Sequence, residues 1–119
     1  MKKFLLIFYF FCLSLPVFSS ENELINLAEF HYNKKEYYNS ITETMRYQFL
    51  YPEGMLFPQS MLIMGKSYYK GGDKERGLNI LSECYNRFTS REEGQTALFY
   101  SGLMRLESGS YYYAVKNFQ

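Results

Sequence analysis

Few residues in this chain have the types and spacing that catalysis or metal binding needs. It holds one histidine, His31, and two cysteines, Cys12 and Cys84, without the clustering of metal ligands. No serine lies in a Gly-x-Ser-x-Gly turn, and no phosphate-binding lysine follows Gly71-Gly72 at the required spacing. We expect His31 to be a packed or half-exposed residue and Cys84 to be a buried, inert thiol. The chain is therefore expected not to be an enzyme, with no catalytic residue, metal or cofactor.

Small residues recur along the chain at a fixed period. Ala28, Gly65 and Gly102 stand 37 positions apart, since 65 − 28 and 102 − 65 both equal 37. Thirteen positions after each comes an aliphatic residue that follows another small one, as in Ser40-Ile41, Gly77-Leu78 and Ala114-Val115. A period of this length is typical of stacked supersecondary units, each of which needs its neighbour to bury its apolar face. Function is then expected on a surface rather than in a catalytic pocket.

Within each period the apolar spacing and the turn residues predict two antiparallel helices. Ser20 and Glu23, and again Ser90 and Glu93, have the spacing of a capping box that starts a helix. Pro58 suits a first helical turn, where its missing N–H group has no acceptor to lose. The predicted fold is all-α, a solenoid of about two and a half hairpins, with helices over about residues 21–33, 36–50, 58–70, 74–88 and 91–107 and a sixth over 111–119.

The small residues have a packing role in this prediction. Two helices of a hairpin approach closely only where the side chains at their crossing are short. We expect Ala28, Gly65 and Gly102 on the first helices to meet the small residues of the second helices, which are Ser40, Gly77 and Ala114.

Residues 1–19 resemble a secretory signal peptide. Lys2 and Lys3 precede a short apolar run, and small residues near Ser19 offer a cleavage site. An uncleaved anchor is the alternative, although the run is shorter than a spanning helix needs. Cys12 could carry a lipid, but Phe11 before it favours an ordinary apolar residue. Cleavage would leave 13 − 2 = 11 basic residues against 12 acidic ones, so no attraction to nucleic acid is expected.

The repeated residues resemble the tetratricopeptide repeat family, whose units are helix-turn-helix pairs with small residues at two fixed positions. The matching repeats cover about 21–54, 58–91 and 95–119, the last incomplete, within a domain of residues 20–119. The period and the linker over residues 51–58 resemble an envelope subfamily that includes the Tol-Pal associated repeat protein and the outer-membrane assembly lipoprotein BamD. The resemblance assigns structural repeat positions to Ala28, Ser40, Gly65, Tyr68, Gly77, Leu78, Gly102 and Ala114.

The same resemblance implies a binding groove on the first helix of each repeat. It assigns to this groove fifteen positions of the three repeats, among them Gln59, Leu62 and Thr96. From these we expect the partner to contact Glu29, Tyr32, Asn33, Lys66, Tyr69, Lys70 and Phe99. Lys66 and Lys70 are one helical turn apart with Tyr69 beside them, and such a group could hold a carboxylate or an extended peptide backbone. The alternative, left open with equal weight, is that both lysines are solvated and that Tyr32 and Tyr69 pack between repeats.

The sequence therefore predicts an exported scaffold that binds a protein or peptide in the bacterial cell envelope, in the periplasm or at the outer-membrane periphery. Anchoring by the uncleaved signal, or secretion, is the alternative location, and an association with the envelope membrane is left open. The alternative function is a structural stacking or oligomerisation module, or a fragment of a longer repeat protein. It rests on the third unit, which would run to position 128 whereas the sequence given ends at Gln119, so that self-association could cover this incomplete repeat.

Overall fold

A computed structural model describes residues 20–109 as five α-helices, and no strand lies within that range. The helices are α2 (Glu21–Asn33), α3 (Tyr37–Leu50), α4 (Phe57–Lys70), α5 (Lys74–Arg87) and α6 (Glu92–Glu107). The prediction of an all-α chain of antiparallel helix hairpins is confirmed. The expected signal peptide over residues 1–19 and the expected sixth helix over 111–119, which includes Ala114, lie outside the described residues.

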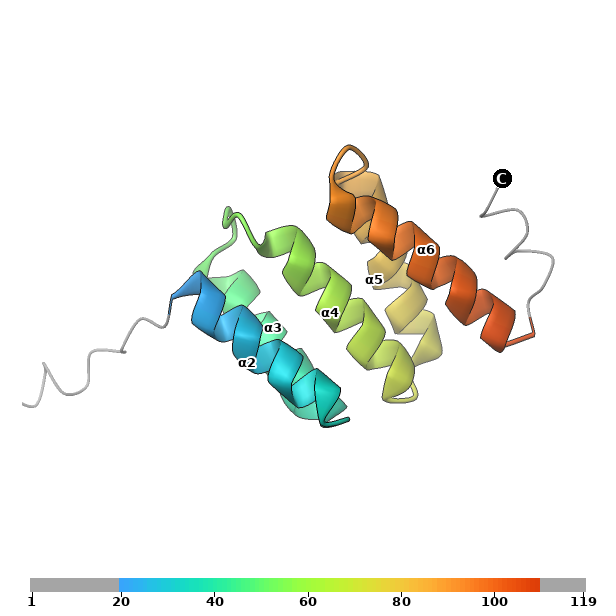
Figure 1. Cartoon of the computed structure of the whole chain (residues 1–119), viewed down its shortest axis with the longest axis horizontal. Helices are drawn as coiled ribbons and strands as arrows, with labels where there is room; N and C mark the ends of the chain where they lie inside the picture. Colours follow the sequence, from blue (N-terminus) through green and yellow to red (C-terminus); the bar gives the residue numbers. More distant parts are fainter. Residues whose placement is uncertain (1–19, 110–119) are drawn as a thin grey trace, which may run out of the picture.

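The helices form two layers (Figure 1). The first helices of the successive hairpins, α2, α4 and α6, lie side by side in one layer, called here the first-helix layer, with α3 and α5 behind them. Helix α4 has the central place, because it packs against α3 and α5 and also contacts α2 and α6. The two complete hairpins are α2–α3 and α4–α5, and α6 stacks on the second. None of the helices in residues 20–109 combines the length and the apolar character needed to cross a membrane.

Side-chain caps explain the starts of two helices, α2 with Ser20 and α5 with Asp73. The Ser20 hydroxyl accepts a hydrogen bond of 3.1 Å from the Glu23 N–H, and the Glu23 carboxylate accepts one from the Ser20 N–H, which confirms the first capping box. The second predicted capping box is wrong. Arg91 rather than Ser90 is the N-cap of α6, and the Glu93 carboxylate pairs with the Arg91 guanidinium at 3.5 Å, so that an ion pair takes the place of the reciprocal hydrogen bonds.

The 37-residue period reappears in the backbone of the hairpin turns. Lys35, Gly72 and Gly109 have positive φ angles of 63°, 110° and 80°, and each N–H donates to the carbonyl three residues before it. In the first turn the Glu36 N–H also donates to the His31 carbonyl at 2.8 Å, which completes a Schellman motif. Glycine adopts this left-handed conformation without strain, whereas a lysine does not. The first hairpin therefore has the same turn as the others with a less suitable residue.

The close crossing predicted from the small residues is confirmed in both complete hairpins. A Cβ atom on Gly77 would lie 2.7 Å from the Gly65 carbonyl oxygen, and one on Gly65 would lie 2.8 Å from the side chain of Leu81. In the first hairpin the Ser40 hydroxyl donates to the Ala28 carbonyl at 2.9 Å. The Ser67 hydroxyl of α4 donates in turn to the Ser40 oxygen at 3.0 Å, so a buried chain of hydrogen bonds links three helices.

The core has two apolar clusters that meet at Phe57. The first lies between α2, α3 and α4 and is built around Leu24, Ile25, Ala28, Tyr47 and Ile63. The second lies between α4, α5 and α6 and is built around Met61, Tyr69, Leu81, Cys84, Ala97 and Met104. Phe57 packs against both clusters, so each hairpin buries its apolar face partly against the next one.

Candidate partner-binding groove

A groove of about 340 Å³ crosses the first-helix layer and takes residues from all three of its helices. We call it the Lys66 groove, and its lining consists of Glu29 from α2, Gln59, Leu62, Ile63 and Lys66 from α4, and Glu92, Glu93 and Thr96 from α6. The residues of α4 are spaced by three or four positions and therefore share one helix face. The lining combines a partly apolar base with several polar side chains, which is the usual character of a binding groove.

The two edges of the groove are tied to its centre by polar contacts. The Gln59 side-chain amide donates a hydrogen bond of 2.7 Å to the Glu29 carboxylate, which joins α4 to α2. The Lys66 ammonium lies 4.8 Å from the ring centroid of Tyr32 on α2 and 4.6 Å from that of Tyr100 on α6. A cation over the face of an aromatic ring is attracted by the negative face of that ring. Lys66 therefore bridges the three helices of the first-helix layer.

Tyr32, one of the two aromatic partners of Lys66, is itself packed among other side chains. Burial raises the pKa of the Tyr32 hydroxyl above its ordinary value, and the nearby Tyr37, Tyr100 and Glu107 raise it further. The Tyr32 ring also meets the ring of Tyr37 edge-on, with centroids 5.7 Å apart. Tyr32 is thus a packing residue beside Lys66 and outside the groove lining, and its hydroxyl stays neutral at physiological pH.

One predicted groove residue needs correction. Tyr69 is 5 % exposed, and its hydroxyl donates a hydrogen bond of 2.7 Å to the Met104 carbonyl of α6. The side of α4 that carries Tyr69 is covered by α6, so this side chain cannot contact a partner. The alternative in which Tyr69 packs between repeats is the one that the structure supports.

The other predicted groove residues divide into two groups. Glu29 and Lys66 line the Lys66 groove. The other lining residues are not among the seven that were expected to contact the partner: Gln59, Leu62, Ile63, Glu92, Glu93 and Thr96. Asn33 and Lys70 are exposed at the ends of α2 and α4, and neither belongs to the lining. Phe99 is 53 % exposed on α6 and meets the ring of Tyr100 edge-on, also outside the lining.

The residues that sequence reasoning missed are Ile63, Glu92 and Glu93. Two acidic residues in the first turn are a common helix-start signal, so Glu92 and Glu93 gave no sign of a second role. Glu92 and Glu93 reach the groove only because the start of α6 packs beside α4.

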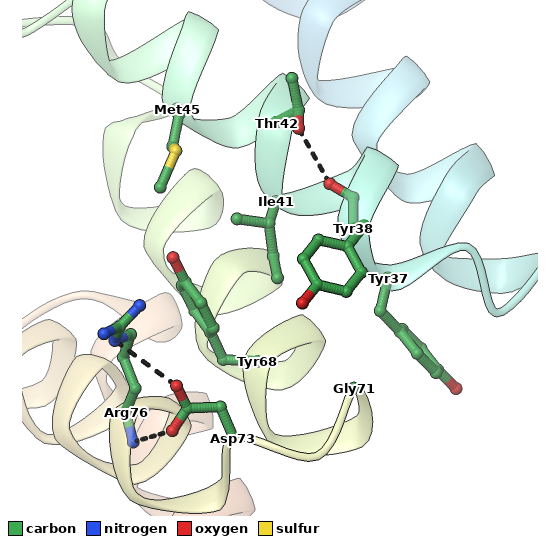
Figure 2. Close-up of a pocket in the computed structure, with 9 residues that line it drawn as sticks. All are labelled: Tyr37, Tyr38, Ile41, Thr42, Met45, Tyr68, Gly71, Asp73 and Arg76. Atoms are coloured by element: carbon green, nitrogen blue, oxygen red, sulfur yellow. Dashed lines mark hydrogen bonds and ion pairs between the residues drawn. The ribbon is translucent and has the colours of Figure 1, made fainter.

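A second, more apolar hollow lies behind the first-helix layer, where α3 meets the turn between α4 and α5 (Figure 2). We call it the Tyr68 hollow; its volume is about 290 Å³, and its lining is Tyr37, Tyr38, Ile41, Thr42, Met45, Tyr68, Gly71, Asp73 and Arg76. The Arg76 guanidinium lies 5.2 Å from the Tyr68 ring and 3.6 Å from the Asp73 carboxylate. The charges at this end of the hollow therefore neutralise each other.

His31 and Cys84 differ in their surroundings. The His31 ring is partly exposed and its Nδ1 lies 3.1 Å from the Glu36 carboxylate. Cys84 is fully buried, as predicted, and burial, with a smaller effect of Glu93, raises the pKa of its thiol to about 11. The thiolate is the reactive form, so Cys84 is inert near neutral pH. Within residues 20–109, no three His, Cys, Asp or Glu side chains gather into a metal-binding group.

Residues 20–109 thus define a stack of antiparallel helical hairpins with a polar groove across its first helices. Comparison of the chain with protein-family models, with curated proteins and with solved structures finds no match. The function proposed below is supported by the groove residues, by the repeat period and by the export signal expected over residues 1–19.

Proposed function

We propose that this chain is an exported tetratricopeptide repeat scaffold that binds an extended peptide segment of a partner protein in the bacterial cell envelope. The observation that carries the proposal is the Lys66 groove, to which α2, α4 and α6 each contribute polar side chains. A groove built by several repeats can follow a segment longer than one helix could contact. The rigid helices keep the groups that meet the segment in fixed positions.

The chemistry of the groove suits a peptide backbone. Gln59 and Thr96 offer both donors and acceptors, and the carboxylates of Glu29 and Glu93 accept hydrogen bonds from N–H groups. Leu62 and Ile63 supply an apolar base for side chains of the segment. Glu29 and Gln59 are already hydrogen-bonded to each other, which reduces the ordering that binding would require.

The family and location in this proposal come from the sequence. The 37-residue period, the linker over residues 51–58 and the signal-like residues 1–19 are the features that resemble the envelope subfamily. The turns of residues 35, 72 and 109 add support for a true repeat, because the same backbone conformation recurs with the same period.

The test is site-specific photo-crosslinking in the cells that export the protein. A photoreactive amino acid replaces Thr96 in the groove, and the matched control replaces Asn79, which is exposed on α5 behind the first-helix layer. We expect a discrete crosslinked product from position 96 and none from position 79. Equal crosslinking at both positions, or none at 96, would contradict a binding role for the groove.

Self-association is a second candidate function, and exposed apolar side chains favour it. Leu27 and Phe30 on α2 are 38 % and 52 % exposed, and Phe49 on α3 is 85 % exposed. Terminal units of repeat proteins normally carry a polar outer face, so an apolar one suits a contact with another unit. Sedimentation at several concentrations separates the candidates. A monomer that persists at high concentration would exclude self-association and leave peptide binding in place.

A further inference from the structure

The charged groups of the Lys66 groove are unequal in number. Its lining carries three carboxylates, Glu29, Glu92 and Glu93, against the single ammonium of Lys66. The N-terminus of α6 adds the equivalent of roughly half a positive charge near Glu92 and Glu93. The carboxylates still exceed the positive charge by more than one, so the groove is negative.

The ion pair of Glu93 with Arg91 cancels one of these carboxylates and leaves an excess of about half a negative charge, carried by Glu29 and Glu92. Glu29 has a neutral partner, the amide of Gln59 at 2.7 Å, and within residues 20–109 no ion pair joins Glu29 or Glu92 to a basic side chain. Glu93 pairs with Arg91 at 3.5 Å, and Arg91 is itself exposed outside the groove lining. The Lys66 ammonium is held at the rings of Tyr32 and Tyr100. Glu29 and Glu92 are therefore left with negative charge to offer a ligand.

The apolar base of the groove suits the stem of a long basic side chain. Leu62 is half-buried and Ile63 is 4 % exposed, and both belong to the lining between the carboxylates of α2 and α6. Lysine and arginine place their methylene stems on apolar surface and keep the charged head at a polar rim. A groove of about 340 Å³ has room for such a side chain with a short length of backbone.

We infer that the Lys66 groove selects a peptide segment that carries a lysine or arginine, whose cationic head lies at Glu29 and Glu92. The inference rests on the proposed function and names its partner class. Of the two ligands expected from Lys66 and Lys70, a carboxylate or an extended peptide backbone, it keeps the backbone and replaces the carboxylate by a cation. Lys70 lies outside the lining, and the Lys66 charge is already placed between two rings.

The test is a nuclear magnetic resonance titration of the isotope-labelled full chain at low salt. The probes are three acetylated and amidated pentapeptides, Ala-Leu-Xaa-Leu-Ala, in which the central residue is arginine, its neutral analogue citrulline, or glutamate. We expect the arginine peptide to shift the amide signals of Leu62 and Thr96, and to bind about fivefold or more tightly than the citrulline peptide. The glutamate peptide is expected to bind most weakly.

Variants that remove carboxylate charges then show which residues cause the preference for the arginine peptide. The double variant Glu29→Gln with Glu92→Gln should bind the arginine peptide no better than the citrulline peptide. The matched control Glu75→Gln removes an exposed carboxylate on α5, outside the groove lining, and should leave the fivefold preference unchanged. Equal binding of the arginine and citrulline peptides in the groove would overturn the cationic partner and leave the peptide-binding function standing. If none of the three peptides shifts groove signals at millimolar concentration and position 96 gives no crosslink, both proposals fail.

Discussion

The Tyr69 hydroxyl donates a hydrogen bond of 2.7 Å to the backbone carbonyl of Met104, and this contact joins α4 to α6. Both residues are buried, at 5 % and 3 % exposure. The same carbonyl also accepts from the N–H and the hydroxyl of Ser108, which follows the last turn of α6. Tyr69 therefore holds the C-terminal part of α6 against the central helix.

Replacing Tyr69 by phenylalanine should lower the free energy of unfolding by about 0.5 to 1.5 kcal/mol, the typical net value of one hydrogen bond. The loss stays moderate because the Met104 carbonyl keeps its contacts with Ser108. Urea denaturation measures the change, and Tyr85→Phe on a partly exposed tyrosine of α5 serves as control. Equal stability of the Tyr69 variant and wild type would show that the α4–α6 bond contributes nothing.

The crossing of α4 and α5 should not tolerate larger residues. Gly77→Ala gains about 1 kcal/mol of helix propensity but brings a Cβ atom to 2.7 Å from the Gly65 oxygen and the Tyr69 nitrogen, which are backbone atoms. We expect a net loss of about 1 to 3 kcal/mol from overpacking. Gly65→Leu should lose a similar amount, because its side chain would meet the buried Leu81. Thermal unfolding measures both, and an unchanged melting temperature would contradict the crossing.

The first hairpin turn should be improved by glycine. Lys35 has a φ of 63°, where a side chain costs about 1 to 2 kcal/mol, and Gly72 and Gly109 occupy the equivalent positions. Lys35→Gly should raise the free energy of unfolding by about 0.5 to 1 kcal/mol after the larger chain entropy of glycine is subtracted. Lys34→Gly, one residue earlier and without positive φ, is the control and should destabilise. A loss of stability in Lys35→Gly would contradict the left-handed turn.

Lys66 should contribute to stability through the contacts of its ammonium with the rings of Tyr32 and Tyr100. Lys66→Met keeps much of the stem but removes the charge, so we expect a loss of about 0.5 to 2 kcal/mol. Lys66→Arg retains a cation and should lose less. Guanidinium is unsuitable as denaturant because its ions screen charges, so urea is used. If the methionine and arginine variants are equally stable, the ammonium does not bridge Tyr32 and Tyr100 in solution.

Cys84 should be unreactive until the chain unfolds. Burial raises the pKa of its thiol from the ordinary 9.0 to about 11, so the folded protein should resist alkylation at pH 8, and urea should expose the thiol. Mass spectrometry of the peptide that contains Cys84 measures the labelled fraction. Between about pH 9 and 11 the unfolded thiol loses its proton first, so stability should fall as pH rises through that window. The Cys84→Ala variant should show a smaller loss of stability between about pH 9 and 11. Rapid alkylation of Cys84 in the folded chain would contradict its burial.

The hairpins could be predicted because their determinants are local and recur. Small residues mark each helix crossing, and the structure places Gly65 against Gly77 as that pattern indicates. Gly72 marked its turn in the same way. Lys35 gave no turn signal, because a lysine adopts the left-handed conformation only when the rest of the hairpin imposes it.

The groove could be predicted only in part, because it depends on how neighbouring hairpins sit beside each other. Tyr68 and Tyr69 are adjacent and equally amphipathic, yet Tyr69 meets α6 and is buried while Tyr68 lines the hollow behind the first-helix layer. Periodicity within α4 identifies its faces but not which neighbour covers each face. Glu92 was missed for the same reason, since its distance from α4 is set by the stacking of α6.

The bond between the Ser67 and Ser40 hydroxyls has a mechanical consequence. A slip of one hairpin along the other would separate these buried groups and leave the Ser67 hydroxyl without its acceptor, while Ser40 keeps its bond to the Ala28 carbonyl within the first hairpin. Each buried hydroxyl left without a partner costs about 1 to 3 kcal/mol, whereas a purely apolar contact could slide at a smaller cost. The stack should therefore resist shear at this junction and deform by bending, so that tension on a bound segment would change its curvature rather than its register.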